Sequence, residues 1–171
     1  MRRYLFEVDN EEPVVGDKLI CLKNDWDNMN GIGDINVNGT IGYVKNISYN
    51  RHHQWLHPML TLDFIPDYYN PVDIYNYGED KLYFKDLNVD YKLLTTGEPT
   101  INKNNFNKFP KPFRPKEFDY GYCITAWKAQ GSEYDKVLLF EENFPFDAEE
   151  HRKFLYTAIT RAKEKIVIVR K

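Results

Sequence analysis

Residues 118–171 constrain the fold more than any other stretch, because strand-like and helix-like apolar patterns alternate along them. Tyr120, Tyr122 and Ile124 alternate with smaller residues, as the side chains of a strand do. The apolar runs 136–140 and 165–169 are short and suit buried strands. We therefore expect three strands in this region.

Helical signals fall between these expected strands. A short helical turn fits 126–130, and Asp147 stands three residues before Glu150, which is a capping pattern for a longer helix. The apolar face of that helix would be formed by Phe154, Leu155, Ala158, Ile159 and Ala162. The order β-α-β-α-β predicts a parallel sheet, whose ligands bind at the carboxyl ends of the strands. Because Thr125–Glu133 begins where the first strand is expected to end, we predict a ligand site there.

Two blocks in this region carry a resemblance to a known family. They read Thr-Ala-Trp-Lys-Ala-Gln-Gly-Ser-Glu at Thr125–Glu133 and Tyr-Thr-Ala-Ile-Thr-Arg-Ala at Tyr156–Ala162. They resemble motifs V and VI of superfamily 1 DNA helicases, in the RecD-like and Dda-like branch (exonuclease V alpha-subunit type). A weaker match at Val15–Leu19, Lys23–Trp26 and Asn38–Val44 looks like the start of the SH3-like β-barrel that this branch inserts into its second RecA-like domain.

The resemblance implies a fold of α/β plus all-β class. A partial RecA-like parallel sheet, from the second domain of a P-loop NTPase, would carry a small SH3-like β-barrel insertion. We expect an N-terminal stub at 1–12, the barrel at 13–101, a basic Pro-rich linker at 102–116 and the RecA-like part at 117–171. Within 13–101, strands are expected at 18–22, 40–47, 59–65 and within 81–94, with loops at 24–38 and 66–78.

The resemblance also assigns roles to single residues. Arg161 would be the catalytic arginine finger, because phosphoryl transfer needs positive charge on the transferred oxygens; a surface arginine is the alternative. Gln130, Gly131 and Glu133 would bind nucleotide with Arg161, although Glu133 could instead be an exposed loop acid. The DNA-binding residues would be Thr125, Trp127, Lys128 and Ser132.

Trp127 departs from the family pattern, which commonly has histidine at this position. An indole has one hydrogen-bond donor and no acceptor, so it cannot replace all contacts of an imidazole. Trp127 could stack on a base of single-stranded DNA. Packing beneath the short helical turn is an equal alternative.

The nucleotide-binding motif of the first helicase domain is absent from this sequence. None of Gly31, Gly33, Gly39, Gly42 and Gly131 is followed by the Lys-Ser/Thr of a P-loop. The chain would therefore use ATP and Mg²⁺ only together with an N-terminal ATP-binding helicase domain, and we expect no ATP hydrolysis by the chain alone. The other expected partner is single-stranded DNA, on which the parent helicase would move 5′ to 3′.

Composition limits the kinds of binding site and the cellular location that we expect. The net charge of −3 means that any DNA contact must be local. We expect no membrane span, no secretory signal and a cytoplasmic location, with Cys21 and Cys123 as buried reduced thiols in strands. We predict no metal site and treat the four histidines as exposed loop residues; they are His52, His53, His57 and His151.

Charge patterning separates two further stretches. Acidic residues dominate 63–90, which would repel phosphates, whereas 102–116 is basic, holds three phenylalanines and contains no acid. The basic stretch is either a solvated linker or a single-strand contact.

Two other functions stay open beside the helicase hypothesis. The chain could be a stand-alone, non-catalytic nucleic-acid-binding module, or a protein-interaction module built on the barrel. Unpaired sheet edges would also favour self-association of the isolated chain.

Overall fold

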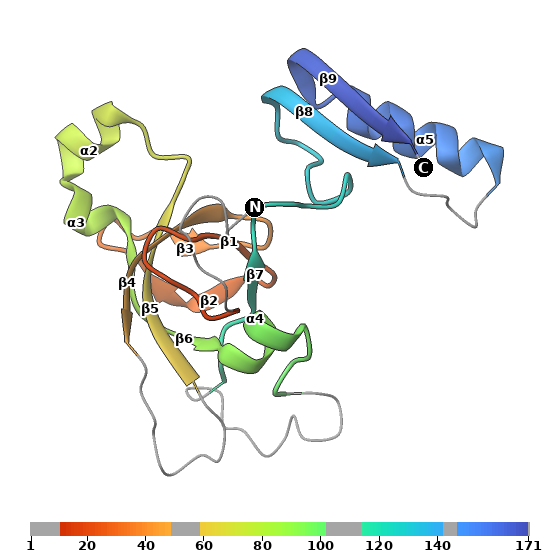
Figure 1. Ribbon diagram of the computed structural model, residues 1–171. Coiled ribbons are helices and arrows are strands. Elements are labelled where there is room, and N and C mark those ends of the chain that lie inside the picture. Colours follow the sequence, from red (N-terminus) through yellow and green to blue (C-terminus); the bar gives the residue numbers. More distant parts are fainter. Residues whose placement is uncertain (1–10, 49–58, 102–113, 142–146, 171) are drawn as a thin grey trace. The chain divides into compact units, whose positions relative to one another are not determined.

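The structure is a computed structural model that describes residues 11–48, 59–101, 114–141 and 147–170. Two compact units make up the chain, Met1–Tyr122 and Cys123–Lys171, which we call unit 1 and unit 2 (Figure 1). The basic stretch of the sequence and His52, His53 and His57 lie largely or wholly outside the described residues.

Unit 1 is built on a five-stranded sheet in the order β6-β5-β4-β1-β7. All of its strand pairs are antiparallel. The strands are β1 (Lys18–Cys21), β4 (Ile41–Ser48), β5 (Met59–Pro66), β6 (Phe84–Asp90) and β7 (Phe118–Tyr120). The expected strands at 18–22, 40–47 and 59–65 are therefore confirmed.

The segments expected to be loops in unit 1 contain regular structure. The stretch 24–38 forms the antiparallel pair β2 (Asp25–Met29) and β3 (Ile35–Asn36). The stretch 66–78 contains α2 (Pro71–Tyr77), which begins at a capping box formed by Asn70 and Asp73. The loop predictions for both stretches were wrong, because polar strand residues and a short capped helix give weak periodic signals.

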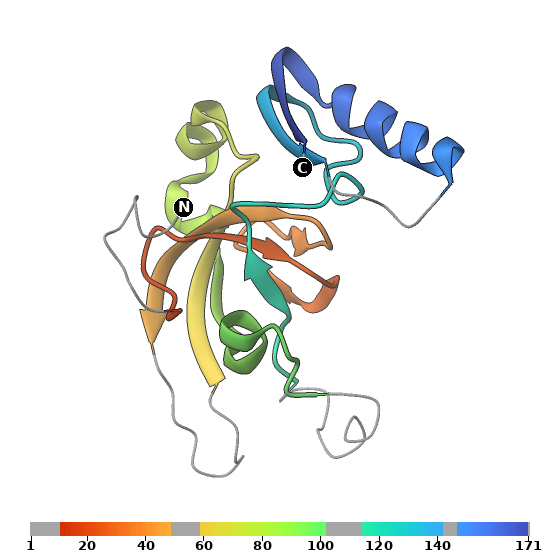
Figure 2. The same ribbon diagram turned by 45° about the vertical axis from the view of Figure 1, so that its right-hand side comes forward.

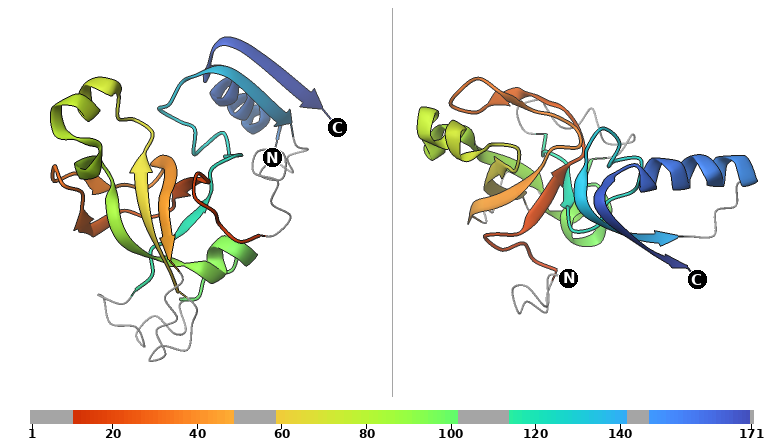
Figure 3. Two further views of the ribbon diagram at one scale, coloured as in Figure 1. Left: turned by 60° about the vertical axis from the view of Figure 1, so that its left-hand side comes forward. Right: turned by 90° about the horizontal axis from the view of Figure 1, so that it is seen from above.

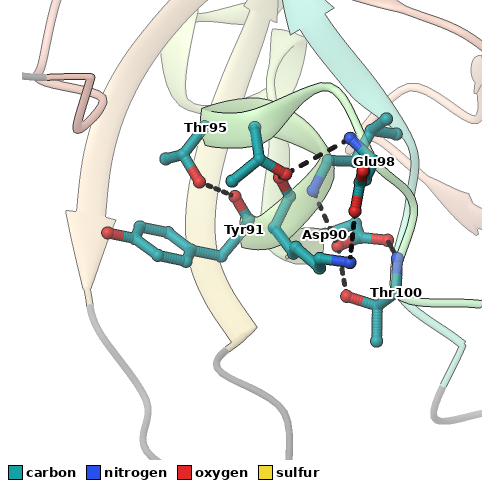
Figure 4. Close-up of polar contacts among 8 residues, drawn as sticks. Asp90, Tyr91, Thr95, Glu98 and Thr100 are labelled. Carbon is teal, nitrogen blue, oxygen red and sulfur yellow. Dashed lines mark hydrogen bonds and ion pairs between the residues drawn. The ribbon is translucent and has the colours of Figure 1, made fainter.

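Two more helices flank β6. They are α3 (Glu79–Leu82) and α4 (Tyr91–Thr96), and Figure 2 shows α4 beside β7. Asp90 anchors α4, because its buried carboxylate accepts hydrogen bonds from the backbone N–H of Leu93 at 3.1 Å and from the backbone N–H and hydroxyl of Thr100 at 2.7 and 2.6 Å (Figure 4). One carboxylate thus starts the helix and holds the chain that leaves it.

The core of unit 1 lies against the five-stranded sheet. Its largest side chains include Phe64 and Phe118, whose rings meet edge to face with centroids 5.1 Å apart. A parallel bridge between Val89 and Lys116 connects β6 to the residues that precede β7. The strand pairing among the described residues forms an open order, so the SH3-like barrel is not confirmed and stays a prediction.

Unit 2 is a parallel strand pair covered by one helix. It consists of β8 (Tyr134–Glu141), α5 (Ala148–Ile159) and β9 (Ala162–Arg170), with β8 and β9 parallel. Asp147 caps α5, accepting hydrogen bonds from the backbone N–H groups of Glu149 and Glu150, both at 2.9 Å. The expected helix cap and the strands at 136–140 and 165–169 are confirmed.

The expected first strand of the parallel sheet is not part of it. Residues Phe118–Tyr120 form β7, which pairs antiparallel with β1 in unit 1. The three-stranded parallel sheet was therefore a wrong prediction, because an alternating pattern indicates a strand but not its partner. Cys123 was also misplaced, since it is exposed and lies outside the strands, whereas Cys21 is buried in β1.

Candidate functional site

The segment 125–132 forms a compact turn at the start of unit 2. The backbone N–H of Ala129 donates to the carbonyl of Thr125 at 3.1 Å, which is the spacing of one helical turn. The hydroxyl of Thr125 accepts a bond from the backbone N–H of Lys128 at 3.3 Å, and Ala129 is buried. The short helical turn expected at 126–130 is therefore present as a single turn, held by its own backbone.

Most of the predicted ligand-binding side chains of this turn point into solvent. Trp127 is 54% exposed, which argues against the alternative that it is a core residue. The other exposed members are Thr125, Lys128, Gln130, Gly131, Ser132 and Glu133. These side chains are thus accessible to a ligand.

Gly131 ends the turn in a conformation that favours glycine. Its φ is +89°, and a Cβ built on it would meet nothing within 4 Å. The backbone conformation, rather than crowding by a neighbour, therefore explains the glycine. It lets the chain reverse before Ser132 and enter β8.

Arg161 lies beside this turn, at the entry to β9. Its Nη1 donates to the carbonyl of Ser132 at 3.1 Å, its Nε to the carbonyl of Thr157 at 3.2 Å, and its Nη2 to the hydroxyl of Thr160 at 3.2 Å. Its own carbonyl accepts a bond from the backbone N–H of Tyr134 at 2.8 Å. The structure therefore brings the two sequence blocks together, and the partly buried guanidinium is fixed in one orientation while keeping further N–H donors.

A second cation lies at the same end of the strands. Lys163 Nζ is 3.6 Å from Glu133 Oε2, and both side chains are more than half exposed. Such a surface ion pair contributes little to stability, about 0–1 kcal/mol. The cluster next to the turn thus holds two cations, Arg161 and Lys163, and one carboxylate, Glu133, so one positive charge is left for an anionic ligand.

This cluster lies at the amino ends of β8 and β9, because the turn precedes β8 and Arg161 precedes β9. The expectation that the ligand block would follow a strand of the parallel sheet was therefore wrong. The carboxyl end carries a different cluster, in which Glu141 contacts His151 Nε2 at 3.0 Å and Arg170 Nε at 2.6 Å. His151 belongs to α5 and is partly buried, so it is no exposed loop histidine.

A pocket of about 400 Å³ adjoins the turn. Its lining includes Cys123, Trp127, Leu138, Phe140 and Phe154. Apolar side chains dominate, so the pocket suits a flat apolar group better than a phosphate. Sequence reasoning did not find Leu138, Phe140 or Lys163; alternation along β8 was the signal that could have placed Leu138 and Phe140 on one face.

The described residues contain neither a metal-binding cluster nor a helix that could span a membrane. Among them no group of three or more His, Cys, Asp or Glu side chains could hold a metal ion. In the same residues no helix has the length and apolar character that crossing a bilayer requires.

The site thus combines a short, exposed turn before one parallel strand with a fixed arginine before the next. Residues 120–169 match the family model described as the UvrD-like helicase C-terminal domain. This part of the chain is therefore similar to the C-terminal region of a superfamily 1 helicase.

The crystal structure of Pif1 helicase from Candida albicans is similar with a TM-score of 0.45 and 14% identity, over 92% of this chain and 32% of that chain. The chain thus spans about a third of that helicase. Comparison with curated proteins gives no match.

Proposed function

We propose that this chain is the C-terminal part of an ATP-dependent DNA helicase of the RecD-like branch, moving 5′ to 3′. One observation carries the proposal: within the stretch similar to a helicase C-terminal domain, Arg161 Nη1 contacts the Ser132 carbonyl at 3.1 Å. The contact joins the arginine to the turn that follows Thr125. A cytoplasmic location suits the protein, because Cys21 and Cys123 are free thiols.

Arg161 would act as the arginine finger in this helicase. Its contacts with the carbonyls of Thr157 and Ser132 hold the guanidinium before a nucleotide arrives, and preorganised charge stabilises a developing anion without reorganisation cost. Gln130, Gly131 and Glu133 would complete the nucleotide side. The bound ATP and Mg²⁺ would supply the phosphoryl group and its counter-charge; we assign no magnesium ligand among the described residues.

The remaining side chains of the turn would bind single-stranded DNA. The exposed indole of Trp127 offers a face on which a base can stack, for about 1–3 kcal/mol. Lys128 and the hydroxyls of Thr125 and Ser132 would bind phosphate oxygens. The apolar pocket beside Trp127 supports a base-binding role for this side of the turn.

Fluorescence-anisotropy binding of the whole chain to single-stranded DNA, over a series of salt concentrations, tests the DNA assignment. We expect Trp127→Ala to weaken binding at every salt concentration. We expect Lys128→Ala to weaken binding and also to reduce its salt dependence, because one phosphate contact is lost.

Trp26→Ala provides the matched control, since Trp26 is a 66%-exposed tryptophan in unit 1. Equal losses for Trp26→Ala and Trp127→Ala would contradict the assignment of DNA binding to the turn. If the chain does not bind DNA alone, the same series with an ATP-binding helicase domain added decides whether the DNA site is shared between the two.

A protein-interaction role for unit 1 is the second candidate, and α2 favours it. This helix has no buried residue, while Val72 and Tyr75 are 63% and 89% exposed. A helix of two turns is marginal by itself. Acidic side chains nearby, including Asp80, argue for a polypeptide rather than a nucleic acid as its partner.

A further inference from the structure

Unit 1 contains a pocket of about 380 Å³ that the DNA assignment does not use. Three parts of unit 1 line it: residues 23–27, which include the start of β2, Asp90 at the end of β6, and residues 114–117, which precede β7. The backbone N–H of Lys116 donates to the Asn88 carbonyl at 2.6 Å, and the N–H of Asp90 donates to the Lys116 carbonyl at 2.9 Å. Paired backbone therefore holds this wall of the pocket in place.

A tryptophan contributes to the pocket. Trp26 lines it and is 66% exposed. A register shift between Asp25 and Met29 interrupts the alternation of β2, so Trp26 and its neighbour Asp27 both reach the same pocket. The face of an indole is negative and attracts a planar cation, most often a guanidinium. Trp26 therefore favours a cationic ligand.

The charges that line the pocket have a negative sum. Four carboxylates and three cations line it: Asp25, Asp27, Asp90 and Glu117, with Lys23, Arg114 and Lys116. Lys23 Nζ lies 2.5 Å from Glu117 Oε1. Lys116 Nζ lies 2.6 Å from Asp25 Oδ1 and 3.7 Å from Asp27 Oδ2. Because Asp25 is the nearer partner and is buried, the 72%-exposed carboxylate of Asp27 is the one that a ligand can reach. The excess negative charge disfavours a phosphate.

The strand beside the pocket favours a polypeptide as the source of the cation. β2 and β3 form a two-stranded sheet of their own, apart from the five-stranded sheet (Figure 3). Among the described strands, β2 pairs with β3 alone. A strand with a partner on one side can pair with an extended chain on the other. Such a chain would carry its side chains past the pocket.

We propose that this pocket binds an arginine side chain of a partner polypeptide that lies extended along β2. Arginine fits better than lysine, because its planar guanidinium can stack on the indole of Trp26 and donate to the carboxylate of Asp27. The site belongs to unit 1 alone and does not depend on the helicase assignment.

NMR titration of the whole chain with the capped peptide Ala-Thr-Val-Arg-Val-Thr-Ala tests the proposal. We expect saturable shifts of the Trp26 indole N–H and of the backbone amides of residues 23–27 and 114–117. Citrulline in place of arginine keeps the shape of the side chain and removes its charge, so this peptide should bind about fivefold more weakly. A lysine peptide should bind with intermediate strength.

Charge variants of the pocket should change the affinity in opposite directions. Asp27→Asn removes the accessible carboxylate and should weaken binding about two- to fivefold. Lys23→Gln removes the cation that pairs with Glu117, so it should strengthen binding. Asp135→Asn is the matched control, because Asp135 is an exposed carboxylate of unit 2. It should leave peptide binding unchanged.

The spectrum of each variant without peptide shows whether unit 1 stays folded, and the peptide series needs no variant. No saturable shift at residues 23–27 and 114–117, or equal binding of the arginine and citrulline peptides, overturns the proposal. Single-stranded DNA that shifts the same residues, with binding strengthened by Asp27→Asn and weakened by Lys23→Gln, would assign the pocket to nucleic acid and would overturn it as well.

Discussion

Unit 1 has a large core of fully buried side chains, whereas the buried cluster of unit 2 is small among the described residues. Phe64, Phe84 and Phe118 of unit 1 are 0% exposed. Among the described residues of unit 2, the buried cluster consists of Leu139, Phe154 and Ala158, with partly buried neighbours. Unit 1 thus has the core of an independent domain, while unit 2 resembles one layer of a larger fold. Variants in matched pairs test this difference.

The largest expected effect comes from the aromatic cores. Phe64→Ala removes a fully buried ring that contacts Phe118, and we expect it to destabilise unit 1 by about 3–5 kcal/mol. Phe154→Ala should instead unfold unit 2 alone, because its cluster is small. Hydrogen exchange resolved by residue measures both. Loss of protection in unit 1 on Phe154→Ala would contradict the independence of unit 1.

The helix-capping aspartates form the second pair. Asp90 is 2% exposed and accepts bonds from Leu93 and Thr100, so Asp90→Ala removes the acceptor of three hydrogen bonds and should cost about 3 kcal/mol. Asp147 is exposed and caps only α5, so Asp147→Ala should cost about 1 kcal/mol. Urea denaturation, followed by a signal from each unit, measures the two losses of unfolding free energy. Equal losses would mean that the bonds from Thr100 to Asp90 add nothing to the helix cap.

The two cysteines give a pH-dependent comparison. Burial raises the pKa of Cys21 from 9.0 to about 11, so its thiol stays protonated in the folded state while the unfolded chain ionises. The free energy of unfolding should therefore be unaffected below about pH 9 and should decrease by about 2–3 kcal/mol as the pH rises to about 11. Cys21→Ala should remove this alkaline loss in a pH series of urea denaturations.

Thiol labelling checks the same difference directly. At about pH 8 the thiolate fraction of Cys21 is on the order of one in a thousand, so alkylation should reach the exposed Cys123 first. Rapid alkylation of Cys21 in the folded chain would show that unit 1 opens more readily than its core implies.

The glycines with positive φ give the smallest effect. Gly33 and Gly131 have φ of +90° and +89°, and neither has an atom within 4 Å of a built Cβ. Alanine at either position should cost roughly 1–2 kcal/mol of backbone strain. Only Gly131→Ala should also weaken DNA binding, because it shifts the turn that Arg161 contacts. Equal DNA binding by both variants would show that the turn is not part of the DNA site.

The sequence was sufficient for elements with strong local patterns. The apolar runs of β8 and β9 and the cap at Asp147 predicted a strand, a helix and a strand, and all three are present. The sequence was insufficient to place β7 in a sheet. Its alternating pattern indicates a strand, but its partner β1 lies far away in the sequence. The helix α2 could have been found, since Asn70-Pro71 followed by Asp73 is a capping signal.

The candidate site divides in the same way. Sequence blocks identified the turn and Arg161, but the hydrogen bond from Arg161 to the Ser132 carbonyl depends on how β8 and β9 pair. The exposure of Trp127 likewise depends on tertiary packing, which periodicity within one short turn does not encode. The exposed apolar pairs Leu138–Val167 and Phe140–Val169 could be recognised only once the register of β8 and β9 was known.

Hydrogen exchange of the whole chain with and without single-stranded DNA tests the central claim most directly. We expect protection at 125–132, the turn of unit 2, with unit 1 unchanged. Protection confined to unit 1, for example around Trp26, would contradict the claim that this turn is the DNA-binding site.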